Sequence, residues 1–194
     1  MEISRFPVPS VEDMPADLAE RIRQIADKTG FIPNVFLALA HRPAELRAFM
    51  AYYDAVMERE GGLAKADREM VVVATSALVS CNYCVVAHGA ILRVRARDPR
   101  ISDFVALNYR QAPITARQRA MLDYAVKLSA TPDRVDEDDL AALRASGFDD
   151  EEIWDIAAVV ALFALSNRMA HAIALKPNEE FHLMGRVPRG SAGS

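Results

Sequence analysis

Apolar residues recur at helical spacing along most of this chain. Leu18, Ile22 and Ile25 would share one face of a helix over 17–28, and Gly30 is a typical residue for ending it. No stretch combines strict apolar–polar alternation with the turn chemistry that strands require. The pattern therefore predicts an all-α protein. Beyond 17–28, the expected helices cover residues 34–40, 43–58, 63–80, 82–95, 99–108, 115–129, 135–146 and 149–175.

Specific residue types mark several of these boundaries. Asn34 is a good candidate for the N-cap of its helix, and Pro43 suits the first turn of the next one. Thr115, with Gln118 three residues later, matches a capping box. These residues therefore predict the same helix starts as the spacing of the apolar residues.

The segment 63–80 is ambiguous between a strand and a helix. Met70–Val73 would suit a buried strand, but Lys65–Glu69 is a typical helical opening and the segment is long for a strand. We predict a helix that is buried nearly all round. On it Glu69, Ser76 and Ser80 would form one narrow polar line. The alternative is that Glu69 simply complements the helix dipole and the serines bond locally.

Length and composition favour one domain with a single core. The chain has 194 residues, of which 52% are hydrophobic. We expect one all-helical domain over 1–185, opening with an extended arm over 1–15, and a flexible tail over 186–194. Within that tail, Val187–Ser191 resembles part of a protease-cleavage linker.

A faint internal repeat is visible at an offset of 51 residues. The second copy would lack the chemistry of the first, because Cys81 and Cys84 align with Pro132 and Val135. The pattern therefore predicts at most a degenerate repeat. The matching positions are Leu63, Arg68 and Met70 with Ile114, Arg119 and Met121.

Charge and hydropathy argue against several partner classes. The formal net charge is −4 and the pI is about 5.6, which disfavours nucleic-acid binding and a polybasic membrane anchor. The longest apolar run, Ile153–Leu165, contains Asp155 and is shorter than the roughly 20 residues that span a bilayer. It predicts a core helix. With no secretory signal visible in 1–13, we expect a cytoplasmic protein that binds neither membrane nor nucleic acid.

The two cysteines of the chain stand three residues apart. On a helix Cys81, Cys84 and His88 (i, i+3, i+7) would share one face, which brings two thiols beside an imidazole. A thiol must become a thiolate before it attacks, and both a helix N-terminus and a neighbouring base favour that form. In a reducing compartment a close pair is more often catalytic or metal-binding than structural. The motif indicates a redox dithiol.

Other uses of this motif fit less well. A zinc site needs four ligands, or three and a water, and the remaining histidines (His41, His171 and His182) are scattered. Covalent haem attachment would place a histidine directly after the second cysteine, where Val85 stands. A thioredoxin-type domain would carry the pair within a βαβ pattern, and no strand is expected here. We therefore predict no metal and no cofactor.

A chemical hypothesis follows from the helical spacing. His88, one turn after Cys84, could accept its proton, and Glu69 on the neighbouring helix would orient the imidazole and raise its basicity. Cys84 would then attack as the thiolate, and Cys81 would convert the resulting sulfenic acid into a disulfide. The alternative for His88 is an ordinary core histidine with a satisfied ring.

Taken together, these residues resemble a known family. Glu69 followed by Ser76–His88 fits the E-x11-C-x-x-C-x3-H pattern of the AhpD-like alkylhydroperoxidase branch of the carboxymuconolactone decarboxylase family. Residues 31–50 are further similar to a subgroup called uncharacterised peroxidase-related enzymes. The resemblance covers about residues 15–180.

The resemblance implies an AhpD-like helical bundle, a homo-oligomer (dimer, trimer or hexamer) and thiol-based reduction of hydroperoxides. Cys84 matches the peroxidatic cysteine and Cys81 its partner and proton donor, while Glu69 and His88 match the proton relay. Tyr83 stands where the best-known members have histidine, which removes one proton-handling group. Those members use a thiol or dithiol electron donor, namely a peroxiredoxin and a dihydrolipoyl carrier.

Two other functions stay open at this point. One is a non-redox decarboxylase of the same family acting on a small acid, although such enzymes are not expected to need a CxxC pair. The other is a non-catalytic redox sensor whose thiols change its association state. The aromatic cluster Phe49, Tyr52 and Tyr53 and the run Ile153–Leu165 add to the expectation of subunit contacts.

Overall fold

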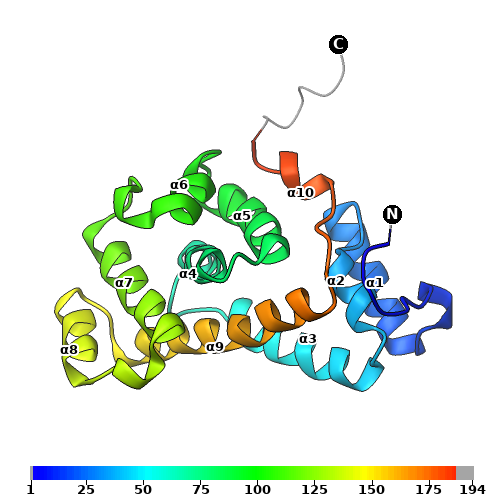
Figure 1. Ribbon diagram of the computed structural model, residues 1–194, viewed down its shortest axis with the longest axis horizontal. Helices are drawn as coiled ribbons and strands as arrows, with labels where there is room; N and C mark the ends of the chain where they lie inside the picture. The colour runs from blue at the N-terminus through cyan, green and yellow to red at the C-terminus, as the bar shows by residue number, and fades with distance from the viewer. Residues whose placement is uncertain (1, 187–194) are drawn as a thin grey trace, which may run out of the picture.

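The computed structural model describes residues 2–186, and within that range it contains ten α-helices and no strand. The predicted all-α class is therefore confirmed, and Figure 1 shows the helices in their spatial order. Of the predicted flexible tail 186–194, Arg186 forms an ion pair with Asp103 at 2.7 Å, and residues 187–194, including the linker-like segment, lie outside the described residues. The helices are α1 (Ala16–Thr29), α2 (Asn34–Leu39), α3 (Pro43–Met57), α4 (Lys65–Leu78), α5 (Asn82–Ala96), α6 (Ile101–Asn108), α7 (Ala116–Ala130), α8 (Glu137–Ala145), α9 (Asp150–Ala172) and α10 (Glu180–Leu183).

Most predicted helix boundaries agree with the structure to within a few residues. Gly30 ends α1 in the left-handed conformation at φ 86°, and Thr115 and Gln118 form both halves of the capping box of α7. Pro43 is the first residue of α3. The prediction for Asn34 was wrong by one residue, because Pro33 is the N-cap of α2. The Asn34 N–H is instead satisfied by the Oδ1 atom of Asn178, 2.8 Å away.

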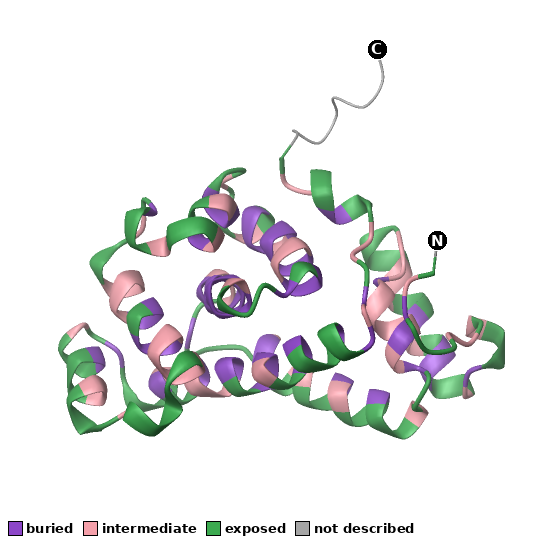
Figure 2. Ribbon diagram, viewed as in Figure 1, coloured by how far each residue is buried: buried purple, intermediate pink, exposed green. Residues whose placement is uncertain are grey.

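Helix α4 lies at the centre of the protein. In Figure 1 it is seen nearly end-on, with α5, α6, α7 and α9 around it, and all four pack against it. Ten consecutive residues, 67–76, are buried, as its colour in Figure 2 shows. The prediction of a helix buried all round is confirmed, and the polar line is correct for Glu69 and Ser76. Ser80 is not part of it, since the helix ends at Leu78 and Ser80 is exposed.

Helix α9 packs against one side of α4 and is the longest helix of the described residues. By length and composition alone its 23 residues could cross a membrane. More than half of its most apolar window is buried inside the protein, however, and it packs along α4, α7 and α3. This agrees with the prediction of a core helix for Ile153–Leu165. Trp154, Leu165 and Met169 are its large exposed apolar residues.

The N-terminal arm pairs with the segment that follows α9. The arm before α1 contains one 3-10 turn, Val11–Asp13. Its Arg5 N–H donates to the carbonyl of Ile173, and the Lys176 N–H donates back to the carbonyl of Ile3.

Helices α4 and α7 begin 51 residues apart, at Lys65 and Ala116, which is the offset of the predicted repeat.

A buried ion pair closes the loop between α3 and α4. Arg68 is fully buried, and its Nη2 atom lies 3.1 Å from Oδ2 of Asp155 on α9. Arg68 also donates to the carbonyls of Arg59 and Gly61, and Asp155 accepts the N–H of Leu63 at 3.0 Å. Charged groups removed from water need such partners, and of the guanidinium nitrogens only Nε of Arg68 has none among the described residues. The network determines where α4 begins and how the start of α4 packs against α9.

A substitution at Gly62 would show how closely the backbone packs against this ion-pair network. Both Gly61 and Gly62 have positive φ values, but a Cβ at Gly62 would clash with Oδ2 of Asp155, whereas a Cβ at Gly61 would meet nothing within 4 Å. Backbone strain alone costs roughly 1–2 kcal/mol at either position. We expect Gly62→Ala to lower the free energy of unfolding by about 1–3 kcal/mol more than Gly61→Ala. Urea denaturation of both variants measures this difference, and equal midpoints would contradict it.

Candidate active site

The turn between α4 and α5 positions both cysteines. The chain leaves α4 through Ser80, which has a φ of 52°, and the Cys81 N–H donates to the carbonyl of Ser76 at 3.0 Å. Cys81 is the N-cap of α5, Cys84 lies in its first turn and His88 follows one turn later. The expected arrangement on a helix face therefore holds for Cys84 and His88, with Cys81 at the open helix start.

Glu69 and His88 form a hydrogen-bonded pair between the two helices. Oε2 of Glu69 lies 2.7 Å from Nδ1 of His88, and the carboxylate is completely buried. A carboxylate only accepts, so the Nδ1 atom carries the proton and Nε2 is the acceptor in the neutral ring. Phe163 packs edge-on against the imidazole with the ring centroids 4.6 Å apart. The pair is thus fixed in tautomer and in orientation.

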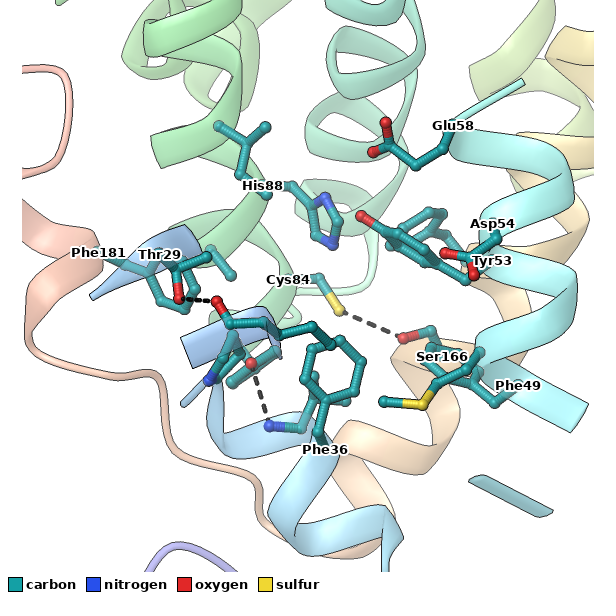
Figure 3. Close-up of a pocket in the computed structure, with 18 of the residues that line it drawn as sticks. Thr29, Phe36, Phe49, Tyr53, Asp54, Glu58, Cys84, His88, Ser166 and Phe181 are labelled. Carbon is teal, nitrogen blue, oxygen red and sulfur yellow. Dashed lines mark hydrogen bonds between the residues drawn. The ribbon is translucent and has the colours of Figure 1, made fainter. Parts of the chain in front are cut away.

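The two thiols are close to each other but face different surroundings. Both are free and only 1% exposed. Cys84 lines a pocket that also contains His88, as Figure 3 shows, and its Sγ atom lies 3.9 Å from Oγ of Ser166 on α9. Cys81 does not line that pocket. A molecule bound there would meet the sulfur of Cys84.

The thiol pair holds its negative charge on Cys81. Hydrogen bonding from the Cys84 thiol lowers the pKa of Cys81 to about 6 against the opposing effect of burial, and the main-chain N–H of Cys84 acts in the same direction. The same hydrogen bond, together with burial, raises the pKa of Cys84 above its ordinary value. This distribution differs from the expected one, in which Cys84 was the thiolate. The thiol facing the pocket is the protonated member of the pair.

The pocket has a volume of about 610 Å³ and an apolar interior. Its walls come from α1, α2, α3, α5, α9 and α10, which are far apart in the sequence. Charged side chains occur at its mouth, among them Lys28, Glu58 and an ion pair of Arg21 with Asp54 at 2.6 Å. The aromatic lining residues are Phe36, Phe49, Tyr53, Tyr83, Phe163 and Phe181. Such a site fits an organic molecule with an apolar body.

Tyr83 has a structural task that its sequence position did not reveal. Its hydroxyl accepts the N–H of Val35 at 3.2 Å, in the first turn of α2. Burial raises the pKa of the Tyr83 phenol, so this group keeps its proton. The resemblance predicted only that a proton-handling histidine is lost at this position. In the structure, Tyr83 connects α5 to α2, which forms part of the pocket wall.

Sequence reasoning missed several residues around the site. Ser166 beside Cys84 and the aromatic ring of Phe163 belong to a helix that the apolar pattern marked only as core. Phe49 and Tyr53, which added to the expectation of subunit contacts, line the pocket, and Tyr52 is half exposed. A signal for Ser166 was available, since Ser166 and Asn167 end the apolar run of α9.

The zinc hypothesis can be compared with the ligand geometry. Within residues 2–186, no three side chains of the histidine, cysteine, aspartate or glutamate type converge as a set of metal ligands. The groups around Cys84 are instead arranged as hydrogen-bonding partners of one another.

Comparisons with known proteins identify the family. Residues 43–107 match the model of the carboxymuconolactone decarboxylase family. A peroxidase-related protein from Ralstonia eutropha JMP134, described as an alkylhydroperoxidase AhpD core, is 58% identical with a TM-score of 0.96, and the match covers 97% of this chain and all of that one. A peroxidase-related protein from Silicibacter sp. TM1040 is 39% identical with a TM-score of 0.91, covering 96% and 97%.

More distant structures share the fold alone. The putative antioxidant defence protein AhpD from Agrobacterium tumefaciens is 22% identical with a TM-score of 0.64, covering 72% of this chain and 94% of that one. No protein of curated function matches the chain. The match to the Ralstonia protein spans both chains almost completely, and the family model covers the cysteine hairpin. The chain therefore belongs to the carboxymuconolactone decarboxylase family, in its AhpD-like branch.

Proposed function

We propose that this protein is a thiol-dependent peroxidase that reduces organic hydroperoxides with the Cys84/Cys81 couple. One observation carries the proposal: the thiol that lines the apolar pocket lies one helical turn from an imidazole held by a buried carboxylate. The names of the two relatives at 58% and 39% identity, both peroxidase-related proteins, support the same activity. The electron donor is a small dithiol or a dithiol protein such as a lipoyl carrier or a peroxiredoxin.

In the first step Cys84 becomes the nucleophile. Its proton moves to the Cys81 thiolate or to Nε2 of His88, and the Cys84 thiolate attacks the distal oxygen of the hydroperoxide. An S–O bond forms as the O–O bond breaks, and the alkoxide leaves as an alcohol with a proton from the imidazolium or the Cys81 thiol. Cys84 is oxidised by two electrons to a sulfenic acid, and the peroxide is reduced.

In the second step Cys81 resolves the sulfenic acid. Its thiolate is favoured by the main-chain N–H of Cys84 at the helix N-terminus, and it attacks the sulfur of Cys84. An S–S bond forms, the S–O bond breaks, and the departing hydroxide takes a proton to become water. The external dithiol then reduces the Cys81–Cys84 disulfide by thiol–disulfide exchange.

The size of the pocket indicates which peroxides fit. A water molecule has a share of about 30 Å³ in the liquid, so a molecule of two oxygens would fill about a tenth of this space. An organic hydroperoxide with an aromatic or branched body would contact Phe36, Phe49 and Phe163 and displace water from apolar walls. The substrates we propose are therefore bulky organic hydroperoxides.

Exchange of each cysteine separates the two steps. Cys84→Ser should abolish dithiol-dependent consumption of cumene hydroperoxide, because the attacking sulfur is lost. Cys81→Ser should stop turnover after one equivalent and leave a sulfenic acid on Cys84, which dimedone labelling and mass spectrometry would locate. Continued turnover by Cys84→Ser would refute the thiol mechanism, and turnover of a muconolactone by the double variant would favour the non-redox alternative.

The shared proton predicts a distinct titration. Because the pKa of Cys81 is lowered to about 6, thiolate absorbance at 240 nm should persist at neutral pH and disappear as the pH falls through about 6. Cys84→Ala removes the donor of the main stabilising hydrogen bond, so the midpoint should rise toward the ordinary cysteine value of about 8.5. Cys81→Ser should show no transition near pH 6. A wild-type midpoint near 8.5, or one unmoved by Cys84→Ala, would contradict the proton-sharing pair.

Substrate preference tests the role of the pocket. We expect kcat/KM for cumene hydroperoxide to exceed that for hydrogen peroxide by at least about tenfold, since burying an aromatic body is worth roughly 1.5–3 kcal/mol. Steady-state assays of both substrates with the same dithiol measure the ratio. Equal values, or a preference for hydrogen peroxide, would show that the apolar walls do not select the substrate.

A further inference from the structure

The second carboxylate oxygen of Glu69 has an unusual environment. Oε2 bonds to His88, but Oε1 is buried and has no hydrogen-bond partner among the described residues. A buried carboxylate without full pairing is destabilised in its charged form. The cation nearest to Oε1 among the ion pairs of the structure is Nη1 of Arg95, 3.4 Å away. Arg95 is thus the group that favours the ionised carboxylate.

Arg95 is divided between two carboxylates. Its Nη2 atom donates to Oε1 of Glu58 at 2.7 Å, a shorter distance than the 3.4 Å between Nη1 and Oε1 of Glu69. Glu58 also accepts from Nζ of Lys65 at 3.2 Å and lies at the mouth of the pocket. The guanidinium therefore connects the solvent-facing Glu58 to the buried pair of Glu69 and His88.

The other groups around this pair do not replace Arg95. Tyr53 from α3 faces Glu69, and burial and that carboxylate both raise the pKa of its phenol, so it stays neutral. Helix α9 contributes Phe163 and Ser166, which carry no charge. The titratable or charged side chains around the pair are Tyr53 and Glu58 from α3, Lys65 from α4, and Cys84 and Arg95 from α5, with Cys81 at the start of α5.

We propose that Arg95 is a positioning residue that keeps the Glu69–His88 pair in its proton-accepting form, and that Glu58 opposes it by drawing the guanidinium away. With Arg95 present, an ionised Glu69 beside a neutral His88 leaves no net charge in the buried cluster. Without it that state carries one negative charge, so the pair would take up a proton at higher pH and His88 could no longer accept one. The role in turnover rests on the proposed peroxidase function; the electrostatic effect does not.

The test uses charge variants with opposite expected signs. Arg95→Met removes the cation and keeps an apolar stem, and Glu58→Gln removes the opposing anion. Arg95→Lys keeps the charge at that position. Arg97→Met is the matched control, because Arg97 is an exposed arginine at the same helix end with no ion pair among residues 2–186.

Proton NMR titration of the imidazole C2–H of His88, assigned with His88→Gln, gives a readout that needs no peroxide. We expect the midpoint to rise by about one to two pH units in Arg95→Met, as is typical for the loss of a charge within 4–6 Å. It should fall in Glu58→Gln, and stay within about half a unit of wild type in Arg95→Lys and Arg97→Met. Shifts of the same sign in Arg95→Met and Glu58→Gln, or no shift in either, would overturn the proposal.

Two further measurements keep the result decisive. If Arg95→Met does not fold by circular dichroism, a downward shift in Glu58→Gln with wild-type behaviour in Arg95→Lys supports the proposal, and an unmoved Glu58→Gln refutes it. The acid limb of peroxide consumption should move with the NMR midpoint in every variant. A protein with no peroxidase activity but with opposite NMR shifts would refute the proposed function and leave the role of Arg95 intact.

Discussion

The hydrogen bond between Glu69 and His88 is the constraint on which the site depends. A carboxylate in the most buried helix of the fold is tolerated only with charged and hydrogen-bonded partners. Those partners are on α5, so the two helices must pack at one register. That register also determines which way the first turn of α5 faces, and hence that Cys84 lines the pocket. Core packing and chemistry therefore impose the same geometry on the α4–α5 hairpin.

The two cysteines differ because of where the helix begins. Cys81 is the N-cap of α5, beside N–H groups that have no partner within the helix, and Cys84 lies in the first turn, in the wall of the pocket. The proton that the pair shares is thus on the sulfur that lines the pocket, and the negative charge is on the sulfur that does not.

Local sequence patterns predicted the helices apart from α10, and they predicted the convergence of Glu69 with His88, because that pair follows from periodicity within one hairpin. They did not predict the pocket. Its walls depend on how α1, α2, α9 and α10 pack around the hairpin, and helical periodicity says which face is apolar but not which helix covers it. Tyr83 is the clearest case. Its hydroxyl satisfies the N-terminus of a helix 48 positions away, a partner that no local pattern encodes.

Arg95 shows the same limit for charge. From the sequence it suits the C-terminal end of a helix, where a cation complements the dipole, and its neighbours Arg93 and Arg97 suit it equally. The structure gives the three arginines different tasks. Arg93 is buried and holds the carbonyls of Phe181 and Met184, whereas Arg97 is exposed. Arg95 alone of the three reaches the carboxylates of Glu58 and Glu69. Because successive residues on a helix are rotated by about 100°, three similar charges at a spacing of two residues point in three directions, and tertiary packing decides which of them reaches the buried carboxylate.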